Sequence, residues 1–242
     1  MTDLAGAVQK TRAGERLSAE EARVLLDAGD LLTLGHLAHR ARLARHPEPL
    51  VTFVVDRNIN YTNICVSGCR FCAFYRPPGH PEGYVITQEA LREKIQETVD
   101  LGGTQILLQG GMNPDLDIDD YCDLLRSIHR EFDIHVHGFS PPEIAFIAKA
   151  SDRSIEETLK VLMEAGLDSI PGGGAEILVD EVREQASPHK CSSGTWLQVM
   201  ETAHQLGLRT TATMMFGHLE SPRHIIQHMD EIRRLQDRTG GF

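Results

Sequence analysis

The sequence of 242 residues predicts an α/β fold built as all or part of a parallel (β/α) barrel, preceded by helices. Two observations support this prediction. After residue 50, short apolar segments alternate with helical segments in five consecutive units. Cysteines, glycine runs, carboxylates and a histidine follow the ends of the predicted strands. Active sites of parallel barrels lie at that end of the strands, so a single site would explain all of these placements.

The N-terminal region, residues 3–46, is predicted to be helical. Ser18-Ala-Glu-Glu21 has the pattern of a capping box, and apolar residues follow on one face. Pro47 and Pro49 are expected to end this region. We therefore expect an N-terminal helical extension over residues 1–49 and a barrel domain over residues 50–242.

The first predicted unit contains two segments rich in β-branched or aromatic residues, Val51–Asp56 and Asn58–Ile64. Both segments have the composition of strands. A loop with three cysteines follows the second segment. Thr87 can then cap a helix, and Gly102 can end it.

The next four units repeat this order. Strands are expected at residues 104–109, 134–139, 167–170 and 208–216, and helices at residues 117–131, 141–165, 196–206 and after Pro222. The predicted strands are apolar rather than alternating, as is typical of parallel sheets with both faces buried.

The composition is that of an ordinary globular protein, with 41 % hydrophobic and 24 % charged residues. A net charge of −11 disfavours binding to nucleic acid or to an anionic membrane surface. No apolar run approaches the ~20 residues of a membrane span, and the first residues do not have the pattern of a signal peptide. Five cysteines, three of them clustered, favour a reducing cytoplasm.

The most informative motif is the spacing C-x3-C-x2-C, formed by Cys65, Cys69 and Cys72. Ferredoxins close an iron–sulfur cluster with four cysteines, whereas three would leave one iron open to a small molecule. The alternative is a structural zinc site, which requires a fourth ligand. Candidates for that ligand are His80, Cys122 and Cys191.

Other strand ends have two interpretations each. Gly110-Gly111 is either a plain turn or a place where the backbone approaches a ligand closely. Glu143 either caps the helix that starts at Ser140-Pro-Pro or contacts a ligand. The glycine run at 172–174 is either a hinge or a close approach to a ligand. His137 lies nearer the mouth of the predicted barrel, although a lone histidine in a strand is more often a core residue, whereas His218 is better placed for a substrate.

Several runs occur in an order that resembles the radical S-adenosylmethionine superfamily, and within it the menaquinone and F420 biosynthesis branch. The runs are Asp56–Asn63, Cys72–Arg76, Gln109–Gly111, Phe139–Glu143, Ile170–Glu176 and Thr211–His218. Within the branch, the chain is most similar to the cyclic dehypoxanthinyl futalosine synthase family, on the strength of Phe74–Gly79 and Asp168–Gly174.

The resemblance implies roles for particular residues. Cys65, Cys69 and Cys72 would hold a [4Fe-4S] cluster. Residues implied to contact S-adenosylmethionine are Phe71, Tyr75, Gly110, Gly111, Ser140 and Glu143, with Met112 where many relatives have Glu. Residues implied to contact the substrate are His137, Gly173, Glu176 and His218.

The activity implied by the resemblance is a radical cyclisation. A 5′-deoxyadenosyl radical would abstract hydrogen from the ribose part of dehypoxanthine futalosine, and the new radical would close a ring. A one-electron donor such as flavodoxin or ferredoxin would be the partner. The alternatives are an aminofutalosine synthase, a subunit of the F420 deazaflavin (FO) synthase, or a non-catalytic iron–sulfur or zinc module. Because the family continues past the equivalent of Phe242, we expect a barrel truncated after the fifth unit.

Overall fold

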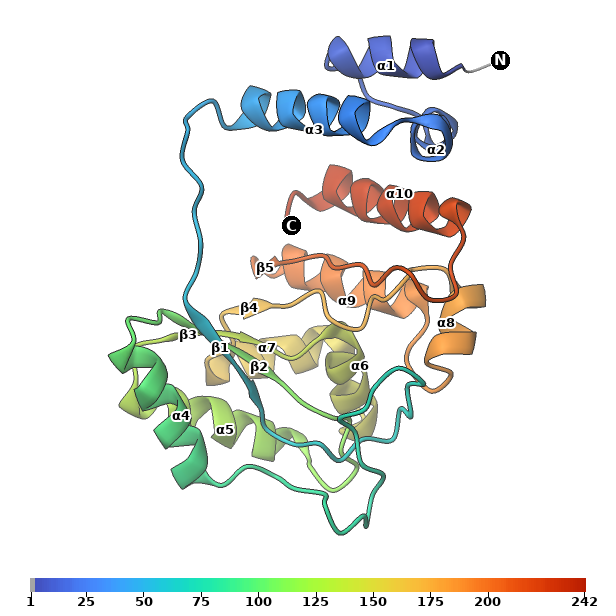
Figure 1. The fold of residues 1–242 in the computed structure, drawn as a ribbon. Helices are drawn as coiled ribbons and strands as arrows, with labels where there is room; N and C mark the ends of the chain where they lie inside the picture. The colour runs from blue at the N-terminus through green and yellow to red at the C-terminus, as the bar shows by residue number, and fades with distance from the viewer. Residues whose placement is uncertain (1–2) are drawn as a thin grey trace.

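The N-terminal region is helical, as predicted, in the computed structural model, which describes residues 3–242. Its helices are α1 (Leu4–Arg12), α2 (Ala19–Ala28) and α3 (Leu31–Arg45). The predicted capping box begins α2, where Ser18 and Glu21 each accept a backbone hydrogen bond from the other. Ala7, Leu25 and Leu37 form a small core between the helices. Figure 1 shows these helices stacked beyond α10 (Pro222–Thr239).

An extended segment, residues 46–55, leads from α3 to the sheet (Figure 1). The prediction of a strand over Val51–Asp56 is wrong, because the first strand, β1, spans Asp56–Asn60. Val51 and Phe53 are 79 % and 88 % exposed. The segment reaches the sheet with a single backbone hydrogen bond, from the Thr104 N–H to the Val55 carbonyl. High β-propensity does not make a strand where no ladder partner lies alongside.

The sheet confirms the predicted α/β architecture. Its parallel strands follow the chain order β1-β2-β3-β4-β5. The strands after β1 are β2 (Gln105–Gln109), β3 (His135–Gly138), β4 (Ser169–Ile170) and β5 (Arg209–Thr210). All of their carboxyl ends therefore lie at one edge of the sheet, which is where parallel α/β proteins place their sites.

Helices connect successive strands, as the repeated βα pattern predicts. They are α4 (Gln88–Asp100), α5 (Ile118–Glu131), α6 (Pro141–Ala150), α7 (Ile155–Ala165), α8 (Asp180–Ala186) and α9 (Ser193–Gln205), and α10 follows β5. Thr87 caps α4 through its side chain, as expected. Within residues 3–242, no helix is both long and apolar enough to cross a membrane.

The fourth and fifth strands are shorter than predicted, and α8 was not predicted. The segment expected as a strand over residues 208–216 is regular only at Arg209–Thr210. Beyond Thr210 the chain still follows β4, because the Thr211 N–H donates to the Ile170 carbonyl. Further on, the Met215 N–H donates to the Glu176 carbonyl. The glycine run after β4 therefore prevents a regular ladder without separating the two segments.

The two faces of the sheet differ, which corrects the expectation of strands that are apolar on both faces. Ile59, Ile106, Leu108 and Val136 are at most 1 % exposed and belong to the main core with the helices. The alternate positions point to the opposite side, which we call the inner face. The inner face carries Asp56, Asn58, Asn60, Gln105, Leu107, Gln109, His135, His137, Ser169 and Arg209.

Candidate functional site

The cysteine loop follows β1 and lies at the carboxyl edge of the sheet. Cys65 and Cys69 are buried, and Cys72 is half-buried. Backbone hydrogen bonds fix the loop, from the Cys65 N–H to the Arg76 carbonyl and from the Cys72 N–H to the Cys69 carbonyl. The three thiols therefore belong to one ordered loop.

Hydrogen-bond donors surround the cysteine sulfurs. The backbone N–H groups of Ser67 and Met112 lie 3.4 and 3.3 Å from Cys65 Sγ. The Ser67 hydroxyl lies 2.9 Å from Cys69 Sγ. Such donors stabilise thiolates, and hydrogen bonds to sulfur also tune iron–sulfur clusters. The donor set thus fits an iron–sulfur cluster chemically.

The zinc alternative finds less support. Among residues 3–242, no three His, Cys, Asp or Glu side chains are gathered closely enough to hold a single metal ion. Cys122 lies in α5 within the main core, 1 % exposed, and His80 Nδ1 accepts a hydrogen bond from the Glu82 N–H. A four-iron cluster is larger than one ion, so its ligands can lie farther apart than zinc ligands.

A cavity of about 200 Å³ adjoins Cys65 at the strand ends. It brings together three of the residues predicted to contact a cofactor, Gly110, Ser140 and Glu143. Its other lining residues are Asn60, Ser67, Gln109, Met112, Pro142, Gly174 and Lys190. The loops after β1, β2, β3 and β4 thus converge on one space, as the sequence predicts.

Glu143 ties the first three strand ends together. Its carboxylate has the predicted capping role at the start of α6, where it accepts from the N–H and the hydroxyl of Ser140. The same carboxylate accepts from the Tyr61 hydroxyl at 2.7 Å and from the Gly110 N–H at 2.9 Å. Burial raises the pKa of Glu143, although these hydrogen bonds oppose the shift. The cap is therefore also a link between β1, β2 and β3.

The glycine pair packs against protein atoms. A Cβ at Gly110 would lie 2.6 Å from the Tyr61 ring, and one at Gly111 would overlap the Ile64 carbonyl. The Gly111 N–H donates to the Thr62 carbonyl at 3.0 Å. The structure thus gives a reason for both glycines that the sequence did not reveal, namely close approach of the cysteine loop.

The glycine run after β4 packs in the same way. A Cβ at Gly173 would overlap the Gln109 amide, and one at Gly174 would overlap the Pro142 ring. The Gly173 carbonyl accepts from Trp196 Nε1 at 3.1 Å. These contacts bring the end of β4 against the ends of β2 and β3.

Glu176 lies in a buried charge cluster beside the cysteine loop. It has a positive φ of 42° and accepts from Lys190 Nζ at 2.7 Å, with Arg183 at 3.4 Å. Lys190 Nζ also lies 5.6 Å from the centroid of the Phe71 ring. Burial alone would lower the pKa of Lys190, but Glu176 and Cys69 outweigh it and raise that pKa.

The remaining predicted residues lie outside the lining of this cavity. Tyr75 is half-buried in the cysteine loop. His137 lies on the inner face and bonds to Ser169. His218 lies after β5, where its ring bonds to the Met215 carbonyl and its N–H to Glu220. Against the opposing effect of burial, backbone N–H groups, first those of Gly217 and His218, lower the pKa of Glu220 to about 2, so this loop is ordered by its own contacts.

Tyr61 and Lys190 belong to the site but were not predicted. Tyr61 is 1 % exposed and connects Glu143 to an aromatic cluster with Tyr121 and Phe139. Lys190 comes from the loop before α9 and is distant in sequence from Glu176 and Phe71. No local pattern marks either residue, because their roles depend on long-range contacts.

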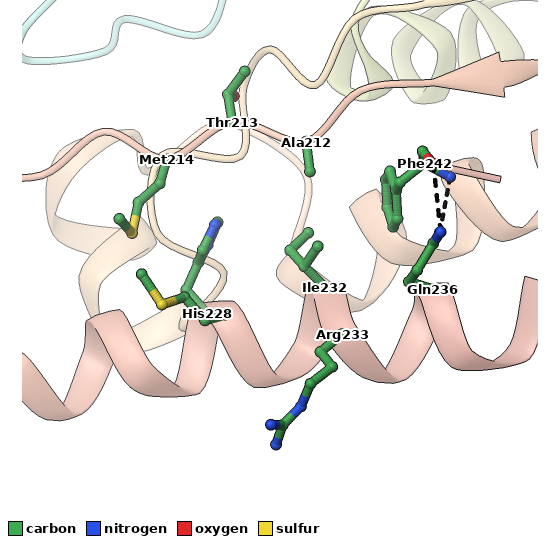
Figure 2. Close-up of a pocket in the computed structure, with 9 residues that line it drawn as sticks. Ala212, Thr213, Met214, His228, Ile232, Arg233, Gln236 and Phe242 are labelled. Atoms are coloured by element: carbon green, nitrogen blue, oxygen red, sulfur yellow. Dashed lines mark hydrogen bonds between the residues drawn. The ribbon is translucent and has the colours of Figure 1, made fainter. Parts of the chain in front are cut away.

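A second cavity lies away from the cysteines. It measures about 460 Å³ and lies between the segment after β5 and helix α10 (Figure 2). Met214, His228 and Ile232 point into it, and Gln236 bonds to Phe242 at one end. It shares no lining residue with the cysteine cavity.

Comparison with protein families gives one clear match. A model described as the Radical SAM superfamily matches residues 59–232. Solved structures of HydG, a maturase of the [FeFe]-hydrogenase, and of methylornithine synthase both superpose with a TM-score of 0.74 at 18 % identity. They cover 98 % and 95 % of this chain, and the chain covers 52 % and 64 % of theirs.

Curated relatives are more similar in sequence. Cyclic dehypoxanthine futalosine synthase of Halalkalibacterium halodurans is 49 % identical over 98 % of this chain and 64 % of its own length. 5-Amino-6-(D-ribitylamino)uracil–L-tyrosine 4-hydroxyphenyl transferase of Methanopyrus kandleri is 47 % identical over 85 % and 56 %. FO synthase of Mycobacterium leprae is 48 % identical over 79 % and 22 %. The chain thus spans less than two thirds of each of these relatives.

Proposed function

Because the chain belongs to the radical SAM superfamily, we propose that it acts as a radical cyclase on dehypoxanthine futalosine, in the futalosine route of menaquinone biosynthesis. The observation that carries this choice is the 49 % identity to a cyclic dehypoxanthine futalosine synthase over 98 % of the chain. Proteins of this superfamily use a [4Fe-4S] cluster and S-adenosylmethionine, which are the cofactors of this chain.

We propose that Cys65, Cys69 and Cys72 hold the cluster. This proposal is supported by the ordered loop and by the hydrogen-bond donors to the sulfurs of Cys65 and Cys69. When bound, the cluster and S-adenosylmethionine supply a carbon radical that abstracts hydrogen from the substrate. The chain's own residues bind, orient and shield the reactants.

We propose that S-adenosylmethionine occupies the cavity beside Cys65. Gly110, Ser140 and Glu143 line it, with Phe71 and Tyr75 in the neighbouring loop. Glu143 positions this wall, because its carboxylate is occupied by protein donors.

For the substrate we propose the inner face of the sheet, whose amides and hydroxyls suit the hydrogen-bonding groups of a ribose. His137 lies on this face, and Gly173 and Glu176 lie at its edge. We propose His218 as a further substrate contact from the loop after β5, which is held by its own hydrogen bonds.

The organisation and setting of the protein follow as further proposals. Residues 1–49 would be a helical extension and residues 50–242 a barrel domain. A one-electron donor such as flavodoxin or ferredoxin would reduce the cluster, with neither nucleic acid nor membrane as partner. Unpaired cysteines favour the reducing cytoplasm.

Product analysis separates the candidate activities. Anaerobically reconstituted protein is incubated with S-adenosylmethionine, dithionite and each candidate substrate. Conversion of dehypoxanthine futalosine to its cyclic product supports the proposal. Turnover of the deazaflavin precursors instead would replace it with the alternative that a 48 % identical FO synthase favours. Turnover of the aminofutalosine precursors would replace it with an aminofutalosine synthase. Iron without any 5′-deoxyadenosine formation would indicate a non-catalytic module.

A further inference from the structure

Two histidines and a serine on the inner face form a continuous chain of hydrogen bonds. Ser169 Oγ lies 2.6 Å from His135 Nε2 and 2.7 Å from His137 Nδ1. His137 is in register with Ser169 across β3 and β4, and His135 is two residues earlier on the same face. A hydroxyl can donate one hydrogen bond while it accepts another, and a neutral imidazole also has one donor and one acceptor.

The two ends of this hydrogen-bonded series, His135 and His137, differ in their surroundings. The His135 side chain is 44 % exposed, and its Nδ1 lies 4.0 Å from Asp168 Oδ2. The Val136 N–H fixes that carboxylate at 2.7 Å, and His129 lies 3.7 Å from it. His135 therefore faces both water and a negative charge.

The other end lies deeper on the inner face. His137 is half-buried, and its Nδ1 is the nitrogen that contacts Ser169, which leaves Nε2 for a ligand. Burial lowers the pKa of His137, and His135 lowers it further while Asp56 opposes the shift. The shift favours the neutral ring, in which the Nε2 lone pair is the acceptor.

We propose that His137, Ser169 and His135 form a proton relay from the inner face of the barrel to solvent beside Asp168. The use of this relay rests on the proposed function, because ring closure must finally release one proton and one electron. The C–H proton of the closed ring is taken by His137 Nε2. Its electron pair stays in the ring, which then gives one electron to an acceptor of the iron–sulfur class.

Protons then shift along the relay. Ser169, at its centre, gains one proton and loses another, so its protonation state does not change. His137 Nδ1–H gives its proton to Ser169 Oγ, and Ser169 gives its own proton to His135 Nε2. The proton on His135 then lies beside the Asp168 carboxylate and within reach of water.

Tautomers read by ¹⁵N NMR test the relay independently of any activity. The relay requires both neutral rings, His135 and His137, to carry their proton on Nδ1, whereas free imidazole side chains can adopt either tautomer. Ser169→Ala should remove this preference at His137, whereas Asp168 beside His135 Nδ1 should keep it at His135. Ser127→Ala, at a buried serine of α5 that bonds to the Leu124 carbonyl, should leave both unchanged. An unaltered tautomer pattern in Ser169→Ala would overturn the relay.

The ratio of cyclic product to 5′-deoxyadenosine tests whether the reaction uses the relay. With dehypoxanthine futalosine, Ser169→Ala should still form 5′-deoxyadenosine but yield about 100-fold less cyclic product, in the range typical of lost acid–base catalysis. His135→Asn, at an exposed position, should lower the yield in the same way if Ser169→Ala folds poorly. If both variants formed as much cyclic product per 5′-deoxyadenosine as the wild type does, the relay would be refuted. Absence of deoxyadenosine in the wild type would refute the proposed function, while the NMR result would still stand.

Discussion

Glu143 and Glu157 hold the same position in two helix capping boxes, but their surroundings differ. Both accept from the backbone and hydroxyl of the preceding serine cap, Ser140 or Ser154. Glu143 is 4 % exposed and also accepts from Tyr61 and Gly110, whereas the Glu157 bonds are exposed. The same local motif therefore has a tertiary role at one site only.

This contrast predicts a difference in stability. Glu143→Ala leaves several buried donors unpaired and should lower the free energy of unfolding by about 3 kcal/mol or more. Glu157→Ala, the matched control, should cost about 1 kcal/mol or less. Urea unfolding monitored by circular dichroism measures both. Equal losses in the two variants would show that Glu143 acts only as a cap.

His228 predicts a pH dependence of stability. It is 3 % exposed in α10 and accepts from the Leu178 N–H at 3.0 Å. Burial, with the charge of Arg183, lowers its pKa from 6.5 to about 4. The unfolded chain therefore binds more protons between these values, and stability present above pH 6.5 is lost as the pH falls toward 4.

The loss is of the order of 3 kcal/mol over that window, from the energy of a pKa shift. Urea unfolding at several pH values measures it. His228→Gln removes the titrating group and should flatten the curve across this window. An equally steep curve in that variant would assign the effect to other groups.

At the scale of elements, local signals predicted the helices better than the strands. The capping residues Ser18 and Thr87 begin helices as expected, because a cap and an amphipathic face act within one segment. The segments 51–56 and 208–216 have strand composition, but strands require a partner. Segment 51–56 has no neighbouring strand with which it forms a ladder. Segment 208–216 is interrupted opposite the glycine run at 172–174.

The candidate site, like the fold, was predictable in part from the sequence. The positions of the cysteine loop and of Gly110 at strand ends follow from the βα rhythm, and the structure brings Cys65 and Gly110 to one cavity. The roles of Tyr61 and Lys190 were not predictable, since they depend on contacts across 82 and 14 residues of sequence. The reason for the glycine pair also came from packing between loops.

Gly111 allows a test of how the cysteine loop meets β2. A Cβ there would overlap the Ile64 carbonyl, so Gly111→Ala should displace the loop and lower the iron content after reconstitution. Gly35→Ala is the control, because that glycine lies in α3 with open space around its Cβ position. Gly35→Ala should stabilise the helix by up to about 1 kcal/mol and leave iron unchanged. Full iron binding by Gly111→Ala would show that the loop tolerates displacement.

At the scale of the whole molecule, an exposed extended segment separates the N-terminal helices from the sheet. Leu50 and Phe53 are 69 % and 88 % exposed. Exposed irregular segments are preferred sites of proteolysis. Brief digestion with thermolysin should therefore cut first within residues 50–55, which mass spectrometry identifies. A first cut inside residues 56–240 would contradict the proposed division at residue 50.

The central claim is that one cysteine loop makes this chain an iron–sulfur protein. Iron and sulfide content after anaerobic reconstitution tests it most directly. The wild-type chain should bind about four irons, and alanine at Cys65, Cys69 or Cys72 should abolish this binding. Alanine at Cys122 or Cys191 should preserve it. Normal iron and sulfide content in Cys69→Ala would contradict the claim.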